Sequence, residues 1–530
     1  MLLILLLTFL QSGMAAWADS AGAVHDARHY DITLVPSDTG THMLGEVQIT
    51  WRLRSAAPVT MELDSAMRVI RVLVDGKPNT RLSRTMYGRS EGHIAVPHQK
   101  QAGDTLSTRV RYRGFTRDGF IIGNNQYGER TMFADNWPNR AHLWLPSHDH
   151  PGDKATVSFH VQVPIDQQVI ANGVLEKIDT LPYGHAMWHY RLDVPVPVFG
   201  MVTGVGRFVR TRLTDAACAT RCVPLSLWTY PQDSSYAISG PFRRAGQMLD
   251  YFSALIAPFP YPSLAHVESS ARVGGSAATA IFYDEKSYLE RKLKEEAVAR
   301  GTAHQWFGNA VTGADWTHLW LSEGLATYLT ALWQGHADGD SAFRTSMRMM
   351  ADTVYGSQAT ERPVLDADSL DPAALLNSNN YQKSAWVLHQ LRGIMGDSAF
   401  FSGLRRYYTT YKDSTAVSSD FERLMSQAAG EDLHWYFRQA LTRPGYPVLD
   451  LRWQHKGGKL TLTITQTQKA EWGTYRMPNL ELLADGRPVR VDVDGRTTRK
   501  VIEGFRRRPD RIEVDPKGWW LLKSTVRSEK

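Results

Sequence analysis

Hydrophobic and polar residues alternate along the first two hundred residues of the chain. Every second position of 47–53 and of 157–163 holds Val, Ile, Trp, Leu or Phe, and polar residues predominate between them. A period of two is typical of strands with one buried face and one exposed face. Residues 25–215 are therefore predicted to form an N-terminal β-rich domain.

The pattern then becomes mainly helical over residues 223–442. A helix is expected from Ser239, as its N-cap, toward Ile256, and further helices are expected at 289–307, 323–334, 341–354, 381–395 and 398–411. Alternation returns after residues 444–447, where Gly457-Gly458 marks the turn of a hairpin, so residues 445–530 are predicted to form a β-sandwich. The predicted fold class is multidomain α+β.

The first eighteen residues have the pattern of a signal peptide. Residues 2–10 are almost entirely apolar, which is too short for a membrane helix of about 20 residues, and Ala16-Trp17-Ala18 is a small-x-small cleavage pattern. We expect export to the periplasm or the extracellular space, without a transmembrane anchor. Because no Lys or Arg precedes the apolar stretch, a misassigned start codon or a buried N-terminal segment is the alternative.

Charge and cysteine content exclude several classes of protein. The formal net charge of +6 is spread over 530 residues without a nucleic-acid-binding module, so no nucleic acid partner is expected. Two cysteines, Cys218 and Cys222, are too few for a disulfide-stapled scaffold or a zinc–thiolate cluster. In an exported protein a local disulfide between them is the preferred interpretation.

One segment of the middle zone carries a recognisable motif. Residues 297–309 read AVARGTAHQWFGN, and residues 319–328 read LWLSEGLATY. These stretches resemble the zinc-binding helices of the aminopeptidase N-like metallopeptidases (peptidase family M1, gluzincins), which carry H-E-x-x-H-Q-W-F-G-N and, eighteen residues later, the glutamate of a W-L-x-E-G motif. Eighteen residues likewise separate His304 from Glu323. Residues 145–154, 280–285 and 381–389 are also similar to the family.

The resemblance implies an architecture and an activity. The architecture is a saddle-like N-terminal β domain, a thermolysin-like catalytic domain and a C-terminal β-sandwich. The activity is zinc-dependent removal of N-terminal residues from peptides. His304 is implied as the second zinc histidine, Glu323 as the downstream zinc ligand, and Tyr381 as the tyrosine that stabilises the oxyanion.

The motif departs from the family at two critical positions. Two histidines at i and i+4 lie on one helical face and present nitrogens to one metal, and the glutamate between them acts as general base. Here Arg300 stands at the first histidine's position and Gly301 at the general base's position. Arginine stays protonated and offers no lone pair, and glycine has no side chain to accept a proton.

A second departure concerns the family's G-x-M-E-N segment, whose glutamate binds the free amine of the substrate. The corresponding residues are Gly274, Gly275, Ser276 and Ala277, in a stretch that is one residue short. No acidic residue lies between Glu268 and Asp284. We therefore expect that the amine anchor is missing.

These losses predict an inactive or severely impaired family member, a pseudopeptidase whose ligands are peptides. A general base contributes about 10²–10⁴-fold in rate, and zinc lowers the pKa of bound water from about 15.7 to near 7. Zinc binding is expected to be weak or absent. The alternatives are a peptidase with non-standard ligands, a non-catalytic peptide-binding protein, and a decayed gene product without a selected role.

Arg300 itself admits two hypotheses. Its guanidinium could pair with Glu323 and partly replace the charge of the metal. It could equally form a surface pair with Glu296, four residues earlier on the same helix.

Overall fold

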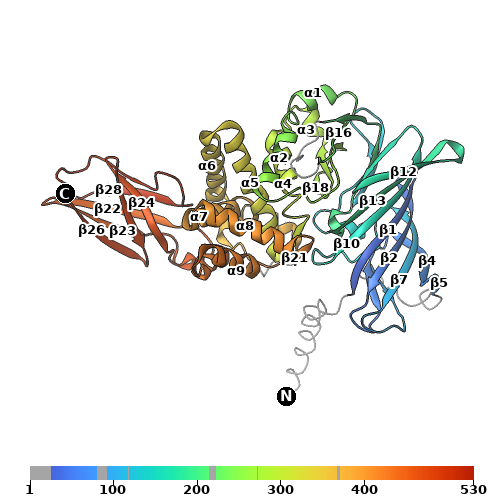
Figure 1. The fold of residues 1–530 in the computed structure, drawn as a ribbon, viewed down its shortest axis with the longest axis horizontal. Helices are drawn as coiled ribbons and strands as arrows, with labels where there is room; N and C mark the ends of the chain where they lie inside the picture. The colour runs from blue at the N-terminus through green and yellow to red at the C-terminus, as the bar shows by residue number, and fades with distance from the viewer. Residues whose placement is uncertain are drawn as a thin grey trace, which may run out of the picture. The chain divides into compact units, whose positions relative to one another are not determined.

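The computed structural model describes residues 25–79, 92–116, 118–213, 222–270, 272–366 and 371–529. The predicted signal peptide, residues 1–18, lies outside the described residues, as does Cys218, whereas Cys222 is disulfide-bonded. The chain forms two compact units, whose helices and strands are labelled in Figure 1. Unit 1 comprises Met1–Gly246 and Phe259–Glu295, and unit 2 comprises Gln247–Pro258 and Glu296–Lys530.

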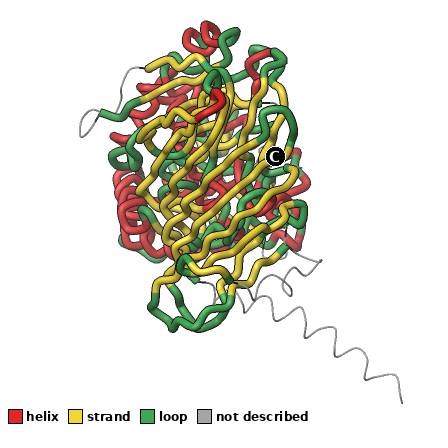
Figure 2. The backbone as a smooth tube through the Cα atoms, turned by 90° about the vertical axis from the view of Figure 1, so that its right-hand side faces the viewer, coloured by secondary structure: helices red, strands yellow, loops and turns green. Residues whose placement is uncertain are grey.

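Unit 1 contains an eight-stranded sheet, whose strands run side by side in Figure 2. In spatial order these strands are β12 (Val174–Leu181), β13 (His185–Pro197), β10 (Lys154–Pro164), β1 (Asp26–Pro36), β2 (His42–Arg52), β7 (Thr105–Phe115), β4 (Met67–Val74) and β5 (Lys77–Pro78). Only the β1–β10 pair is parallel within this sheet. The predicted alternation is confirmed, because Val47, Ile49 and Trp51 of β2 are fully buried.

Two further sheets complete most of unit 1. A four-stranded sheet has the order β11 (Gln168–Ala171), β14 (Thr203–Gly206), β9 (Arg130–Ala134) and β8 (Phe120–Asn124). A five-stranded sheet has the order β15 (Val209–Arg212), β16 (Leu225–Thr229), β17 (Leu264–Ser269), β19 (Ala280–Asp284) and β18 (Gly275–Ala277). A small pair, β3 (Val59–Glu62) with β6 (His93–Val96), and the short helices α1 (Ser234–Ser239) and α3 (Glu285–Leu289) accompany them.

The helical pattern of the middle zone is confirmed in outline, with shifted boundaries. The helices are α2 (Ala245–Leu255), α4 (Glu295–Ala303), α5 (Trp320–Asp338), α6 (Asp340–Gly356), α7 (Ser384–Met395), α8 (Asp397–Tyr411), α9 (Ser418–Ala429) and α10 (His434–Thr442). The expected N-cap at Ser239 is wrong: Ser239 ends α1, and α2 begins at Ala245. Gly240 and Pro241 follow Ser239 and interrupt the helix, since proline cannot continue an interior helical turn.

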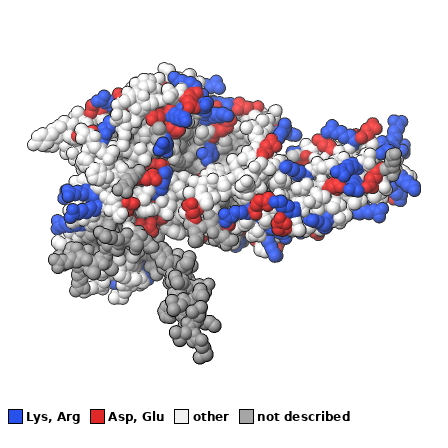
Figure 3. Space-filling model, turned by 180° about the vertical axis from the view of Figure 1, so that it is seen from behind, with Lys and Arg blue, Asp and Glu red and all other residues white. Residues whose placement is uncertain are grey.

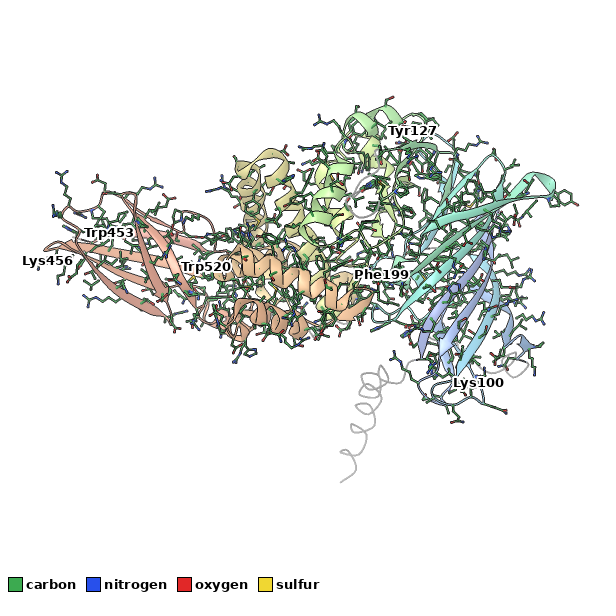
Figure 4. The ribbon with its side chains drawn as sticks, viewed as in Figure 1. Lys100, Tyr127, Phe199, Trp453, Lys456 and Trp520 are labelled. Carbon is green, nitrogen blue, oxygen red and sulfur yellow. The ribbon has the colours of Figure 1, made fainter. Side chains whose placement is uncertain are left out.

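The last eighty residues of unit 2 form the predicted β-sandwich. One sheet has the order β26 (Thr497–Glu503), β23 (Lys459–Gln466), β22 (Val448–Lys456) and β28 (Lys523–Ser528), and the other has β25 (Arg487–Val493), β24 (Met477–Ala484) and β27 (Ile512–Val514). Apolar side chains of both sheets share one core, which includes Trp453, labelled in Figure 4. Gly457 and Gly458, with φ of +58° and +73°, form the turn between β22 and β23.

The sandwich is attached to the helical part of unit 2 by packing. Ile394 of α7 contacts the sandwich core, and the Trp519 ring stacks on His389 of the same helix at 4.7 Å between centroids. Lys and Arg side chains intermingle with Asp and Glu on the sandwich face at the right of Figure 3, in keeping with the small net charge. No helix of the described residues is long and apolar enough to cross a membrane.

Candidate functional site

The end of α4 and the first turn of α5 bring His304 and Glu323 together. His304 follows the last residue of α4, and its backbone N–H still donates to the Arg300 carbonyl at 3.0 Å. Its Nδ1 lies 3.1 Å from the Phe307 carbonyl oxygen, and its Nε2 lies 3.3 Å from Glu323 Oε2. The two side chains are only 8% and 6% exposed, so the pair is largely excluded from water.

A glycine allows α5 to approach the start of α7. A Cβ added to Gly324 would lie 2.5 Å from the Cβ of Ser384, which is closer than real side chains pack. The glycine of the W-L-x-E-G motif is thus required by helix packing. Tyr381 belongs to a π-helical turn at Asn379–Lys383 that leads into α7. Burial, and then the charge of Glu323, raises the pKa of Tyr381 above its ordinary value.

Arg300 lies on the same side of α4 as His304 and pairs with Glu323. Its Nη1 is 3.5 Å from Glu323 Oε2, and its Cζ is 5.8 Å from the centre of the Tyr381 ring. The alternative partner, Glu296, instead accepts a hydrogen bond from Gln334 Nε2 at 3.0 Å. The structure therefore has the ion pair of Arg300 with Glu323 and not the one with Glu296.

The neighbouring residues His304 and Arg300 decide the charge state of Glu323. Burial alone would raise the pKa of this carboxyl, but His304 and then Arg300 outweigh that effect, and the pKa is lowered. Glu323 is therefore a buried carboxylate that contacts Arg300 and His304. Arg300 reaches it from the surface, since 45% of the arginine side chain is exposed.

Gly301, which the family resemblance places at the position of the general base, is buried in α4. Its carbonyl accepts a hydrogen bond from Gln305 Nε2 at 3.4 Å, and the residue offers no side chain for proton transfer. His318 precedes α5, but its Nδ1 lies 2.9 Å from Ser418 Oγ, and its Nε2 lies 3.7 Å from Asp315. This histidine therefore has partners other than Glu323.

The segment that we expect to be a degenerate amine-binding site belongs to unit 1, where Gly275–Ala277 form the edge strand β18. Ala277 pairs with Ala280 of β19, so the hairpin closes over Ala278 and Thr279 alone. Thr279 has a φ of +65°, and its Oγ1 accepts from the Gly173 N–H at 2.7 Å. A Cβ added at Gly275 would meet no atom within 4 Å.

The described residues contain one group of three potential metal-binding side chains: Glu62, His142 and Asp149 in unit 1, with ligand atoms within 4.8 Å of one another. This group could not be predicted from local sequence, because Glu62 is far along the chain from His142 and Asp149. Asp149 Oδ2 already accepts from the backbone N–H of His142 at 3.0 Å and lies 2.8 Å from its Nδ1. These bonds explain the cluster as a structural tie near the family-like stretch 145–154.

Comparisons with known proteins identify relatives of this chain. The sequence matches the Peptidase M1 N-terminal domain over residues 26–199 and the Peptidase family M1 domain over residues 273–439. It is 24% identical over 415 residues to a probable aminopeptidase 1 of Saccharolobus solfataricus, which covers 73% of this chain and 50% of that protein. It is 26% identical over 401 residues to aminopeptidase M1-A of Oryza sativa, covering 71% of this chain and 43% of that protein.

A solved structure gives the same picture. The crystal structure of an M1 zinc metallopeptidase from Deinococcus radiodurans superposes with a TM-score of 0.69 at 25% identity, covering 80% of this chain and 95% of that one. The fold class predicted from the sequence is thereby confirmed. This chain spans about half the length of the curated relatives that it matches. Together, the two domain matches, the aminopeptidase relatives and the shared fold show that the chain belongs to the aminopeptidase N-like peptidase family M1.

Proposed function

We propose that this chain is a pseudopeptidase of the aminopeptidase N-like family, which retains peptides as its class of ligand but hydrolyses them poorly or not at all. The observation that carries the proposal is the pair between Arg300 and Glu323. A guanidinium stands where relatives have their first zinc histidine, and it contacts the carboxylate that would be a zinc ligand.

The residues at this site do not fit a catalytic zinc ion. Such ions take three protein ligands and leave a fourth position to water. His304 and Glu323 supply two, and a guanidinium has no lone pair to become the third. Arg300 also places positive charge beside the carboxylate, where it opposes the approach of a divalent cation. We therefore derive no catalytic step through zinc.

The remaining side chains can bind and orient a ligand without activating water. The raised pKa of Tyr381 keeps its phenol protonated at neutral pH, so that the O–H is available as a donor to a peptide carbonyl. No acceptor stands at Gly301 to remove a proton from water. A general base contributes about 10²–10⁴-fold, so its loss alone impairs turnover severely.

The alternative of an active enzyme with non-standard ligands needs a third side chain near His304 and Glu323. The only described group of three potential ligands lies in unit 1, and it includes neither residue. The alternative of a non-catalytic peptide-binding protein is one form of this proposal. In that form the chain still binds peptides but does not hydrolyse them.

The test combines zinc analysis with turnover of an aminoacyl chromogenic substrate. We compare the wild type with Arg300→His, with Arg300→His/Gly301→Glu, and with Arg300→Gln as the control that removes the guanidinium without adding a ligand. His304→Gln in each background reports how much of the bound zinc depends on this site.

We expect the wild type and Arg300→Gln to show no zinc that depends on His304. Arg300→His should gain one such zinc, and the double variant should add slow peptide hydrolysis. Its preference for a free N-terminus should stay weak, because the segment at Gly274–Ala277 still lacks a glutamate. Stoichiometric, His304-dependent zinc in the wild type, together with turnover, would overturn the proposal.

A further inference from the structure

Two histidines meet on the polar face of the eight-stranded sheet in unit 1. His160 of β10 and His189 of β13 are directly opposite each other in the strand register. Their Nδ1 atoms lie 2.6 Å apart, and their ring centroids are 4.7 Å apart at an interplanar angle of 59°. The outward side chains of β10 alternate with fully buried ones such as Phe159 and Val161, so the pair lies on the face away from the core.

Each histidine has a carboxylate at its other nitrogen. His160 Nε2 lies 3.1 Å from Asp31 Oδ1 of β1, and His189 Nε2 lies 3.0 Å from Asp179 Oδ2 of β12. The four residues come from four strands, β1, β10, β13 and β12, which are neighbours in the sheet and are labelled in Figure 1. The sequence of groups across the sheet is therefore carboxylate, imidazole, imidazole, carboxylate.

This order of groups constrains where the protons are. A carboxylate beside Nε2 favours the tautomer that carries its proton on Nε2, which leaves a lone pair on Nδ1. Two such lone pairs at 2.6 Å repel each other unless a positive centre lies between them or beside them. That centre is either one shared proton or a metal ion.

The carboxylates favour the metal ion. Histidines that bind metals usually donate their second ring N–H to a carboxylate or carbonyl, which fixes the ring and increases its basicity. Both histidines here have a carboxylate oxygen close to Nε2, at 3.1 and 3.0 Å, and the oxygen of Asp179 also accepts from Lys177 Nζ at 2.7 Å. Their side chains are 26% and 15% exposed, so that an ion can enter and water can complete its coordination.

We propose that His160 and His189 form a two-histidine site for a divalent transition metal of the zinc or copper class, bound through the two Nδ1 atoms and oriented by Asp31 and Asp179. Imidazole nitrogen suits these metals. Zinc–nitrogen bonds of about 2.0–2.1 Å hold two tetrahedral ligands about 3.3 Å apart, so the rings need to separate by less than 1 Å. The site contains no residue of the peptidase motif.

The experiment measures Zn²⁺ binding to the full chain after removal of metal with a chelator, by titration calorimetry. To separate this site from any binding at the peptidase motif, all proteins carry His304→Gln. The variants are His160→Gln, His189→Gln and Asp31→Asn. His185→Gln is the matched control, because His185 is also on β13 and lies 3.0 Å from an aspartate, Asp38, without an opposing histidine.

We expect one Zn²⁺ per chain, more than about tenfold weaker binding for either histidine variant, and about 10–100-fold weaker binding for Asp31→Asn. His185→Gln should bind like its parent. Cu²⁺ bound to the parent should show hyperfine coupling to two nitrogens, and one or none in His189→Gln. Unchanged thermal midpoints without metal establish that the variants fold. Binding that is unaffected by both histidine variants, or no Zn²⁺ and Cu²⁺ binding by the parent, would overturn the proposal and leave a shared proton as the occupant.

Discussion

Glu268 of β17 is a buried carboxyl group, and its substitution by glutamine tests how burial controls ionisation in unit 1. The residue is fully buried, and its Oε2 accepts from the Tyr230 N–H at 2.9 Å. Burial is the main reason that the pKa of Glu268 is raised to about 9, and the nearby carboxylates Asp233 and Glu285 raise it further. Glu268 therefore carries its proton at neutral pH.

The sign of the pH dependence follows from proton binding. In the unfolded chain Glu268 loses its proton near its ordinary pKa of 4.5, whereas in the folded protein it keeps the proton up to about 9. Between these values the folded state binds more protons, so the free energy of unfolding falls as pH rises, by about 1.4 kcal/mol per pH unit. From pH 6 to pH 8 this group alone removes about 2.7 kcal/mol.

The substitution Glu268→Gln removes this dependence, because the amide stays neutral and has nearly the same shape. We expect the variant to be more stable than the wild type at pH 8, with the difference smaller at pH 6 by about 2.7 kcal/mol. Opening free energies from hydrogen exchange in the segment 225–230 provide a local measurement. Glu176→Gln, on the exposed strand β12, is the control. Equal pH slopes for the wild type and Glu268→Gln would refute the reasoning.

Three further substitutions test other parts of the fold. Lys383 is buried beside a cavity of about 30 Å³, and burial lowers its pKa to about 7. The free energy of unfolding of the wild type should therefore rise between pH 7.5 and 9.5 by about 1.4 kcal/mol per pH unit. Urea unfolding of Lys383→Met should show no such rise. Gly324→Ala should destabilise unit 2 by about 1–3 kcal/mol through its clash with Ser384, whereas Gly356→Ala, with open space around it, should not, as thermal unfolding will show. Asn172→Ala should lower the free energy of unfolding by about 3 kcal/mol, because the buried Asn172 side chain donates to the Gly200 and Ala278 carbonyls and accepts from the Val202 N–H. Hydrogen exchange near residue 202 measures this loss of stability.

The local sequence pattern was sufficient to predict many of the secondary-structure elements of this protein and its family. The period of two in β2 and β10 and the glycine pair at 457–458 depend on neighbours in sequence, and the structure has strands and a hairpin there. The motif around His304 and Glu323 likewise identified the family, and the same segment predicts that Arg300 and Gly301 stand at the positions of two of its functional residues. Helix ends were less predictable, because the interruption at Gly240-Pro241 competes with a favourable capping residue at Ser239.

The partners of single side chains depended on the tertiary structure. The sequence left two candidate partners for Arg300: Glu296 by its helical spacing, and Glu323 by the family resemblance. The tertiary structure, which brings the start of α5 to the end of α4, decided for Glu323. His160 and His189 are 29 residues apart and meet only because β10 and β13 pair in one register. Sequence determines which residue types recur at which spacing, since that is local information. Strand register and helix packing bring distant residues together, and so they decide which charges and lone pairs face each other.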